Sequence, residues 1–155
     1  MVDPAFIATL GGQQGILART MYGEDRGDGA PGMDAVGCVI RNRVRIAATF
    51  IKVHGRPHPL YGDGSYASAC LVPWQFSSWN AGDPNRAKII AVTAETDPIF
   101  AEALDLAAEI IAGQIADPTN GATSYKESSL PWPASWGTEV PARAVIGHQS
   151  YYCLI

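Results

Sequence analysis

Apolar residues recur at helical spacing in two neighbouring stretches near the start of the chain. They are Ile16, Leu17 and Met21 in the first stretch, and Met33, Val36, Val39, Ile40 and Val44 in the second. This spacing gives each stretch one helical face to bury. A glycine-rich run separates the two stretches and disfavours one continuous helix. We therefore predict helices over residues 13–24 and 32–48, joined by a turn, with Glu24 at the C-terminal end of the first helix.

Three further helices are predicted outside this pair. A short leading helix covers residues 3–10, and another short helix covers residues 85–91. The pair Asp97 and Pro98 is typical of a helix start, and the apolar pattern that follows it continues until Gly113. We interpret this last helix as scaffold whose acidic side chains face solvent.

The remaining segments predict strands and a long loop. Residues 122–125 and 144–152 are rich in β-forming side chains, which favours two antiparallel strands closed by a Pro- and Trp-rich loop. Residues 49–85 show no sustained periodicity, and a loop of that length inside a compact domain is usually functional. The expected fold class is α+β, a single mainly helical domain over 1–155 with a small antiparallel β-hairpin and long active-site loops.

Composition narrows the possible partners. The formal net charge is -4 and the chain has no run of Lys or Arg, so we expect no nucleic acid partner. No stretch approaches about twenty consecutive apolar residues, and the N-terminus lacks the basic start of a signal peptide, so we expect neither a membrane partner nor an export signal. The cysteines are odd in number and unpatterned, which does not indicate a disulfide framework.

Glu24 is the candidate for chemistry on local grounds. A helix C-terminus carries partial negative charge and disfavours a carboxylate, so an acidic side chain held there beside Asp25 and Asp28 keeps its proton more readily. Such a group suits general acid catalysis. The alternative is a solvated loop of acids with Arg19 and Arg26 as basic neighbours, and local evidence does not separate the two.

The long loop carries candidates for sugar binding. Flat aromatic side chains such as Trp79 can stack on sugar rings, and Gln75 and Ser77 can form hydrogen bonds beside them. In the later Pro- and Trp-rich loop, Trp132 and Trp136 could form the opposite wall of such a cleft. The alternative is that aromatic residues of the long loop form a small core of their own.

Several motifs resemble those of the SleB-type cell wall hydrolases, the family of spore cortex-lytic enzymes and related phage lysins. The stretch MYGEDRGDGAPGMDAVGCVIRNRV is similar to the family's signature, and the resemblance continues to about residue 152 through QFS at 75–77, GATSY at 121–125 and IGHQSYY at 146–152. It implies a lysozyme- or lytic-transglycosylase-like fold with Glu24 as the catalytic acid. The family commonly has histidines where this chain has Ser124 and Gln149, with His148 one place earlier.

The resemblance implies cleavage of the peptidoglycan glycan strand between N-acetylmuramic acid and N-acetylglucosamine. A single acid suffices for a lytic transglycosylase, which we favour over a hydrolytic muramidase that needs a second carboxylate. Candidates for that second carboxylate are Asp25, Asp28, Asp34 and Glu127. Expected substrate-binding residues are Gln75, Ser77, Trp79, Tyr125, Trp136 and His148.

Two other classes stay open at this point. A peptidase acting on the peptide stems would need zinc, for which His54 and His58 lack a supporting motif, or a Cys70–His148 pair. A sugar-binding virion domain without activity would be expected to lack Glu24. We expect no cofactor and no metal, peptidoglycan as the partner, and a monomer. We further expect a protein made in the cytoplasm that acts on the cell wall, as a phage or prophage lysin.

Overall fold

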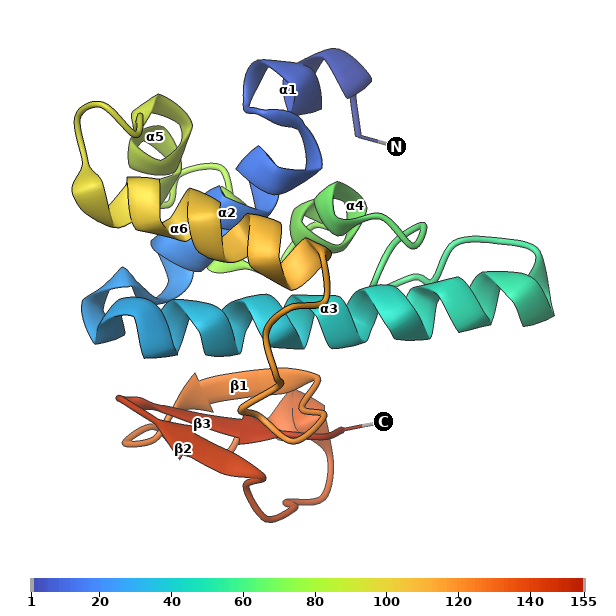
Figure 1. Cartoon of the computed structure of the whole chain (residues 1–155). Helices are drawn as coiled ribbons and strands as arrows, with labels where there is room; N and C mark the ends of the chain where they lie inside the picture. Colours follow the sequence, from blue (N-terminus) through green and yellow to red (C-terminus); the bar gives the residue numbers. More distant parts are fainter. Residues whose placement is uncertain (1, 155) are drawn as a thin grey trace.

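The computed structural model describes residues 2–154 and shows a mainly helical α+β fold (Figure 1). This confirms the predicted fold class. The helices are α1 (Pro4–Thr9), α2 (Gly12–Asp25), α3 (Gly29–His54), α4 (Tyr66–Leu71), α5 (Pro84–Ala91) and α6 (Pro98–Ile111). Asp3, Asp83 and Asp97 each cap a helix that begins with proline, so these starts follow from local sequence. None of the helices in residues 2–154 is long and apolar enough to cross a membrane.

Helix α3 is the central element, because it separates the other helices from a small sheet (Figure 1). Met33, Val36 and Ile40 contribute to a core shared with α2 and α6. Ala35 and Val39, on a different face of α3, pack against Ala122 and Tyr151 of the sheet region. The chain therefore has a helical layer and a sheet layer, and α3 is buried by both.

Helix α3 is longer than predicted at both ends. Its first turn follows directly on a short 3-10 turn at Arg26–Asp28, and its last turns extend to His54, where Gly55 ends the helix in a left-handed conformation. The last turns carry exposed residues such as Val53, so the apolar pattern that predicted the helix was weaker there.

The sheet has three antiparallel strands, β1 (Ser124–Glu127), β2 (Ala144–Ile146) and β3 (Gln149–Tyr152), in the order β1-β3-β2. The prediction of one strand over 144–152 was wrong. Gly147, at a φ of 57°, begins a tight turn that divides this segment into the hairpin β2–β3. The register places Tyr125 opposite Tyr151.

The segment 49–85 is not the continuous loop that the sequence predicted. It contains the end of α3, the short helix α4, and a 3-10 turn, η2 (Ser77–Trp79). Helix α4 has only six residues, capped by Ser65, and buries Ala67, Ala69 and Cys70. So short a helix gives too few turns for an apolar period to appear in the sequence.

Candidate active site

A cavity of about 700 Å³ lies where the end of α2, the middle of α3, the segments before and after α4, and β1 come together. Its described wall contains one carboxylate, Glu24, and one cation, Arg43. The lining residues are Glu24, Arg43, Leu60, Tyr61, Trp74, Gln75, Ser77, Ser124, Tyr125, Ser135, Trp136 and Leu154. Aromatic and hydroxyl side chains thus surround a carboxyl group on α2 and a guanidinium group on α3.

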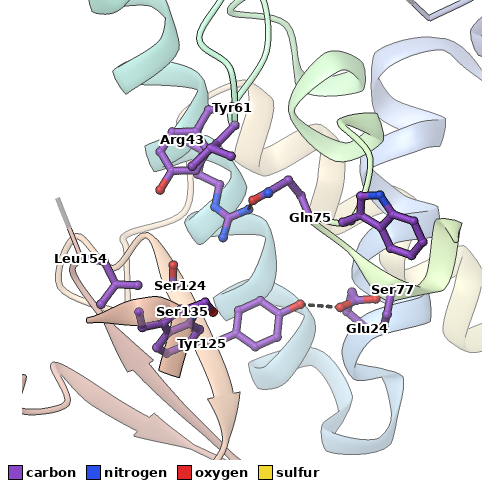
Figure 2. A pocket seen from close by; sticks show the side chains of 12 residues that line it. Glu24, Arg43, Tyr61, Gln75, Ser77, Ser124, Tyr125, Ser135 and Leu154 are labelled. Atoms are coloured by element: carbon purple, nitrogen blue, oxygen red, sulfur yellow. Dashed lines mark hydrogen bonds between the residues drawn. The ribbon is translucent and has the colours of Figure 1, made fainter. Parts of the chain in front are cut away.

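Glu24 lies in the last turn of α2, as the sequence predicted, and its side chain is fixed by two partners. The hydroxyl of Tyr125 donates to Glu24 Oε1 over 2.7 Å, and Figure 2 shows this hydroxyl pointing at the carboxylate. The backbone N–H of Ser78 donates to Oε2 over 3.2 Å, and the Ser78 hydroxyl donates to the same oxygen. Both carboxylate oxygens are therefore held in place before any substrate binds.

Tyr125 is positioned by strand β1 and by its ring contact with Tyr151, at 5.6 Å between ring centroids. Burial, followed by the charge of Glu24, raises the pKa of the Tyr125 hydroxyl well above its usual value. The hydroxyl consequently stays protonated at any working pH. A neutral phenol can donate to an ionised Glu24 and can accept from a protonated one.

Ser78 reaches Glu24 because Gly23 leaves room for it. A Cβ at position 23 would lie 2.8 Å from Ser78 Oγ and 2.9 Å from Ser78 Cβ, closer than side chains pack. Ser78 itself is buried in η2. Ser78 is not among the residues predicted from the sequence, because its approach to α2 depends on the missing side chain at Gly23.

Arg43 was not predicted as a site residue. Only 6% of Arg43 is exposed. Its Nε donates to the Thr123 carbonyl over 2.7 Å, and its Nη1 donates to Gln75 Oε1 over 3.2 Å. The guanidinium also lies against the rings of Tyr61 and Phe76. Burial lowers its pKa below the usual value. The signal in the sequence was a basic residue on an otherwise apolar helical face of the motif.

Of the six expected substrate-binding residues, four lie at the cavity and two do not. Gln75, Ser77, Tyr125 and Trp136 are lining residues. Trp79 is a correction, because its indole N–H donates to Thr20 Oγ1 over 2.9 Å and its ring packs against Phe6. This tryptophan belongs to the helical core. Tyr61 and Trp74, from the same segment, provide aromatic wall instead.

His148 is the second correction. It lies in the β2–β3 turn with 83% of its side chain exposed, and its Nδ1 is 2.6 Å from Asp28 Oδ1. Its backbone N–H also donates to Asp28 Oδ2 over 2.9 Å. His148 therefore does not face Tyr125 across the strands. It joins the sheet to the turn that follows α2, and the hydrogen bond that the imidazole donates to the Asp28 carboxylate raises the pKa of His148.

The four candidate second carboxylates are absent from the described cavity wall. Asp28 forms an ion pair with His148. Asp25 is buried. Burial, together with the hydrogen bond and charge of Asp28, raises the pKa of Asp25 to about 8. Asp34 lines a separate depression near Ile115, and Glu127 is exposed at the end of β1.

The residues suggested for a peptidase are not assembled. Cys70 is fully buried, and burial raises the pKa of its thiol to about 12, so the nucleophilic thiolate is scarce. His58 stacks on Tyr61, and its Nδ1 accepts the backbone N–H groups of residues 60 and 61. Within residues 2–154, no group of three or more His, Cys, Asp or Glu side chains is placed to hold a metal.

The family model described as Cell Wall Hydrolase matches residues 27–152, which is most of the chain. The chain belongs to the cell wall hydrolase family. Membership supports an enzyme that acts on the cell wall, with peptidoglycan as the implied substrate. The match begins at residue 27, just after Glu24, so it does not include that residue.

No curated protein and no solved structure gave a match. The likeness to lysozymes and lytic transglycosylases therefore stays a prediction from the motif. The matched region includes Arg43, Gln75 and Tyr125, so these cavity residues lie in the part of the chain that belongs to the family.

Proposed function

We propose that this cell wall hydrolase cleaves the peptidoglycan glycan strand between N-acetylmuramic acid and N-acetylglucosamine as a lytic transglycosylase, with Glu24 as general acid and base. The observation that carries the proposal is that Glu24 is the one carboxylate in the described wall of the cavity and is held there by Tyr125 and Ser78. A second carboxylate, which a hydrolytic muramidase would need, is not presented to the same space.

The reaction needs one proton to move in each of two steps. In the first, Glu24 donates its proton to the glycosidic oxygen while the bond from that oxygen to the muramic anomeric carbon breaks. In the second, the muramic 6-hydroxyl oxygen bonds to the same carbon, and its proton passes to the Glu24 carboxylate. The products are a free sugar hydroxyl and an anhydro-muramic end, and Glu24 is again protonated for the next cycle.

The partners of Glu24 fit both halves of this cycle. Tyr125 can accept from the carboxylic acid before the first step and donate to the carboxylate after it, since a neutral phenol serves both ways. The backbone N–H of Ser78 donates to Oε2 and holds the carboxyl group in one orientation through the cycle. Aromatic rings of the wall, among them Tyr61 and Trp136, suit the apolar faces of sugar rings.

We propose that the protein performs this reaction as a phage or prophage lysin.

The test is mass spectrometry of the soluble products released from purified peptidoglycan. The wild type should produce anhydro-muramic ends, and Glu24→Gln should lower the rate by about a hundredfold or more, because it removes the proton that the leaving oxygen requires. Glu102→Gln is the matched control, since Glu102 is exposed on α6 and distant in the fold from the cavity wall. It should match the wild type.

Each alternative leaves a different product. Reducing muramic ends would replace the transglycosylase with a hydrolytic muramidase. Released stem peptides, or equal activity in Glu24→Gln, would overturn glycan cleavage through Glu24.

A further inference from the structure

Arg43 is a buried cation that forms no ion pair with an acidic side chain of residues 2–154, although the lowering of its pKa by burial is partly offset by the charge of Glu24 in the same cavity wall. It is 6% exposed in the middle of α3, and the ion pair found in residues 2–154 joins His148 and Asp28 instead. Burying a charge without a partner is costly, so a protein retains such a group where something else compensates it. Arg43 lines the cavity, and its compensation can therefore come from a ligand.

The contacts of Arg43 leave one end of the guanidinium open. Nε donates to the Thr123 carbonyl and Nη1 donates to Gln75 Oε1, whereas Nη2 has no acceptor among the described residues. Figure 2 shows the guanidinium beside the Gln75 amide, within the group of side chains that line the cavity. The rings of Tyr61 and Phe76, at 4.9 and 5.0 Å from the guanidinium carbon, restrict its movement. The open donors are thus presented in a fixed direction.

Arg41 shows that burial alone does not create this arrangement. It lies one position before Asn42 on the same helix and is 5% exposed. Its Nη1 donates to the Ile115 carbonyl and its Nη2 lies 3.6 Å from Cys38 Sγ, so both terminal nitrogens have protein partners. Arg41 also lies outside the cavity wall. An open terminal nitrogen at the cavity therefore distinguishes Arg43 from its buried neighbour.

We propose that Arg43 binds a free carboxylate on the peptide stem of the substrate and makes the enzyme select strands whose stems carry that charge. This inference rests on the proposed function. Arginine pairs with carboxylates through charge-assisted hydrogen bonds, which are the strongest that its free N–H groups can form. Peptide stems branch from the muramic acid residues of the strand. Glu24 and Arg43 line the same cavity, so a stem next to the bond cleaved at Glu24 can reach Arg43.

The experiment compares two substrates for each enzyme. One is purified glycan strand with its peptide stems, and the other is the same strand after its stem carboxylates have been converted to amides. The quantity measured is the ratio of kcat/KM for the two substrates. The wild type should prefer the charged stems by about tenfold or more, because amidation removes the negative charge that strengthens the hydrogen bond from Arg43. In Arg43→Gln this ratio should fall to near one, and Arg43→Lys should give an intermediate value.

The ratio separates a recognition role from a structural one. A poorly folded fraction lowers both rates equally and leaves the ratio unchanged, so a variant that retains the wild-type ratio overturns the proposal. A wild type that cleaves both substrates alike also overturns it, while leaving the proposed glycan cleavage intact. Absence of glycan cleavage from either substrate would overturn both. If Arg43→Gln does not fold, the kcat/KM ratios of Arg43→Lys and of the wild type decide the outcome.

Discussion

The hydroxyl of Tyr125 and the carboxylate of Glu24 are 101 residues apart in sequence and 2.7 Å apart in the structure. One comes from the sheet layer and the other from the end of α2, and the cavity lies between these elements. The position of the candidate acid is therefore controlled by both layers of the fold. Substitutions that disturb either layer near this contact should change activity or stability in ways that can be measured separately.

Replacing Tyr125 by phenylalanine tests the contact itself. The ring can still pack against Tyr151, but Glu24 Oε1 loses its donor. We expect kcat/KM to fall by about tenfold to a hundredfold, since a hydrogen bond to a charged group contributes about 1.5–3 kcal/mol. Product release from purified peptidoglycan measures this. Tyr66→Phe removes a hydroxyl from a half-buried tyrosine outside the cavity and is the control. Unchanged activity in Tyr125→Phe would exclude a role for the hydroxyl.

Asp25 should make the protein less stable as the pH rises. Its pKa is raised to about 8 in the folded state, by burial and then by Asp28, whereas an unfolded aspartic acid ionises near pH 4. Between these values the folded state holds one proton more than the unfolded state. The free energy of unfolding should therefore fall as the pH increases from 4 to 8, by up to about 1.4 kcal/mol per pH unit from this group.

Asp25→Asn should remove this contribution, because an amide does not titrate. Denaturant unfolding at several pH values would compare the slopes of stability against pH for the two proteins. Asp105→Asn, at an exposed position on α6, should retain the wild-type slope. Identical slopes for Asp25→Asn and wild type would show that Asp25 ionises normally in the folded protein.

Gly147 should not tolerate a side chain. A Cβ there would lie 2.3 Å from the Asp28 carboxyl carbon, and the backbone φ of 57° is unfavourable for other residues. We expect Gly147→Ala to lower the free energy of unfolding by about 2–4 kcal/mol, from the steric clash and the backbone strain together. Gly55→Ala is the matched control, since Gly55 has a φ of 67° but nothing within 4 Å of its Cβ position. It should cost only about 1–2 kcal/mol.

Equal losses for the two glycine variants would mean that the turn accommodates the added methyl group by moving away from Asp28. The Asp28–His148 contact would then contribute little to holding the sheet against the turn after α2. Thermal unfolding followed by circular dichroism would measure both variants under the same conditions.

Local patterns predicted the helices well. The apolar period and the glycines after it placed Glu24 at the end of α2, and the pair Asp97 and Pro98 located the start of α6. These features depend on contacts within a few residues, which the sequence displays directly. The divided strand 144–152 was missed because a single glycine in a β-forming segment does not reveal that the chain reverses there.

The candidate site was predicted only in part. Gln75, Ser77, Tyr125 and Trp136 lie at the cavity, where they can contact a ligand. The roles of Ser78 and Arg43 could not be predicted, because each depends on elements distant in sequence. The same is true of the two corrections, since Trp79 and His148 have polar or aromatic character suited to a site but are directed elsewhere by Thr20 and Asp28.

The sequence by itself determined that a carboxylate ends the second helix and that another helix with one apolar face follows after a glycine-rich turn. Helix period and helix ends are local properties, so no tertiary contact is needed to recognise them. Only the tertiary structure decided that Tyr125 and Ser78 would hold that carboxylate, and that Arg43 would present an open nitrogen to the same cavity. Those outcomes depend on strand register, on the space left at Gly23 and on packing between layers, which are set by the whole chain at once.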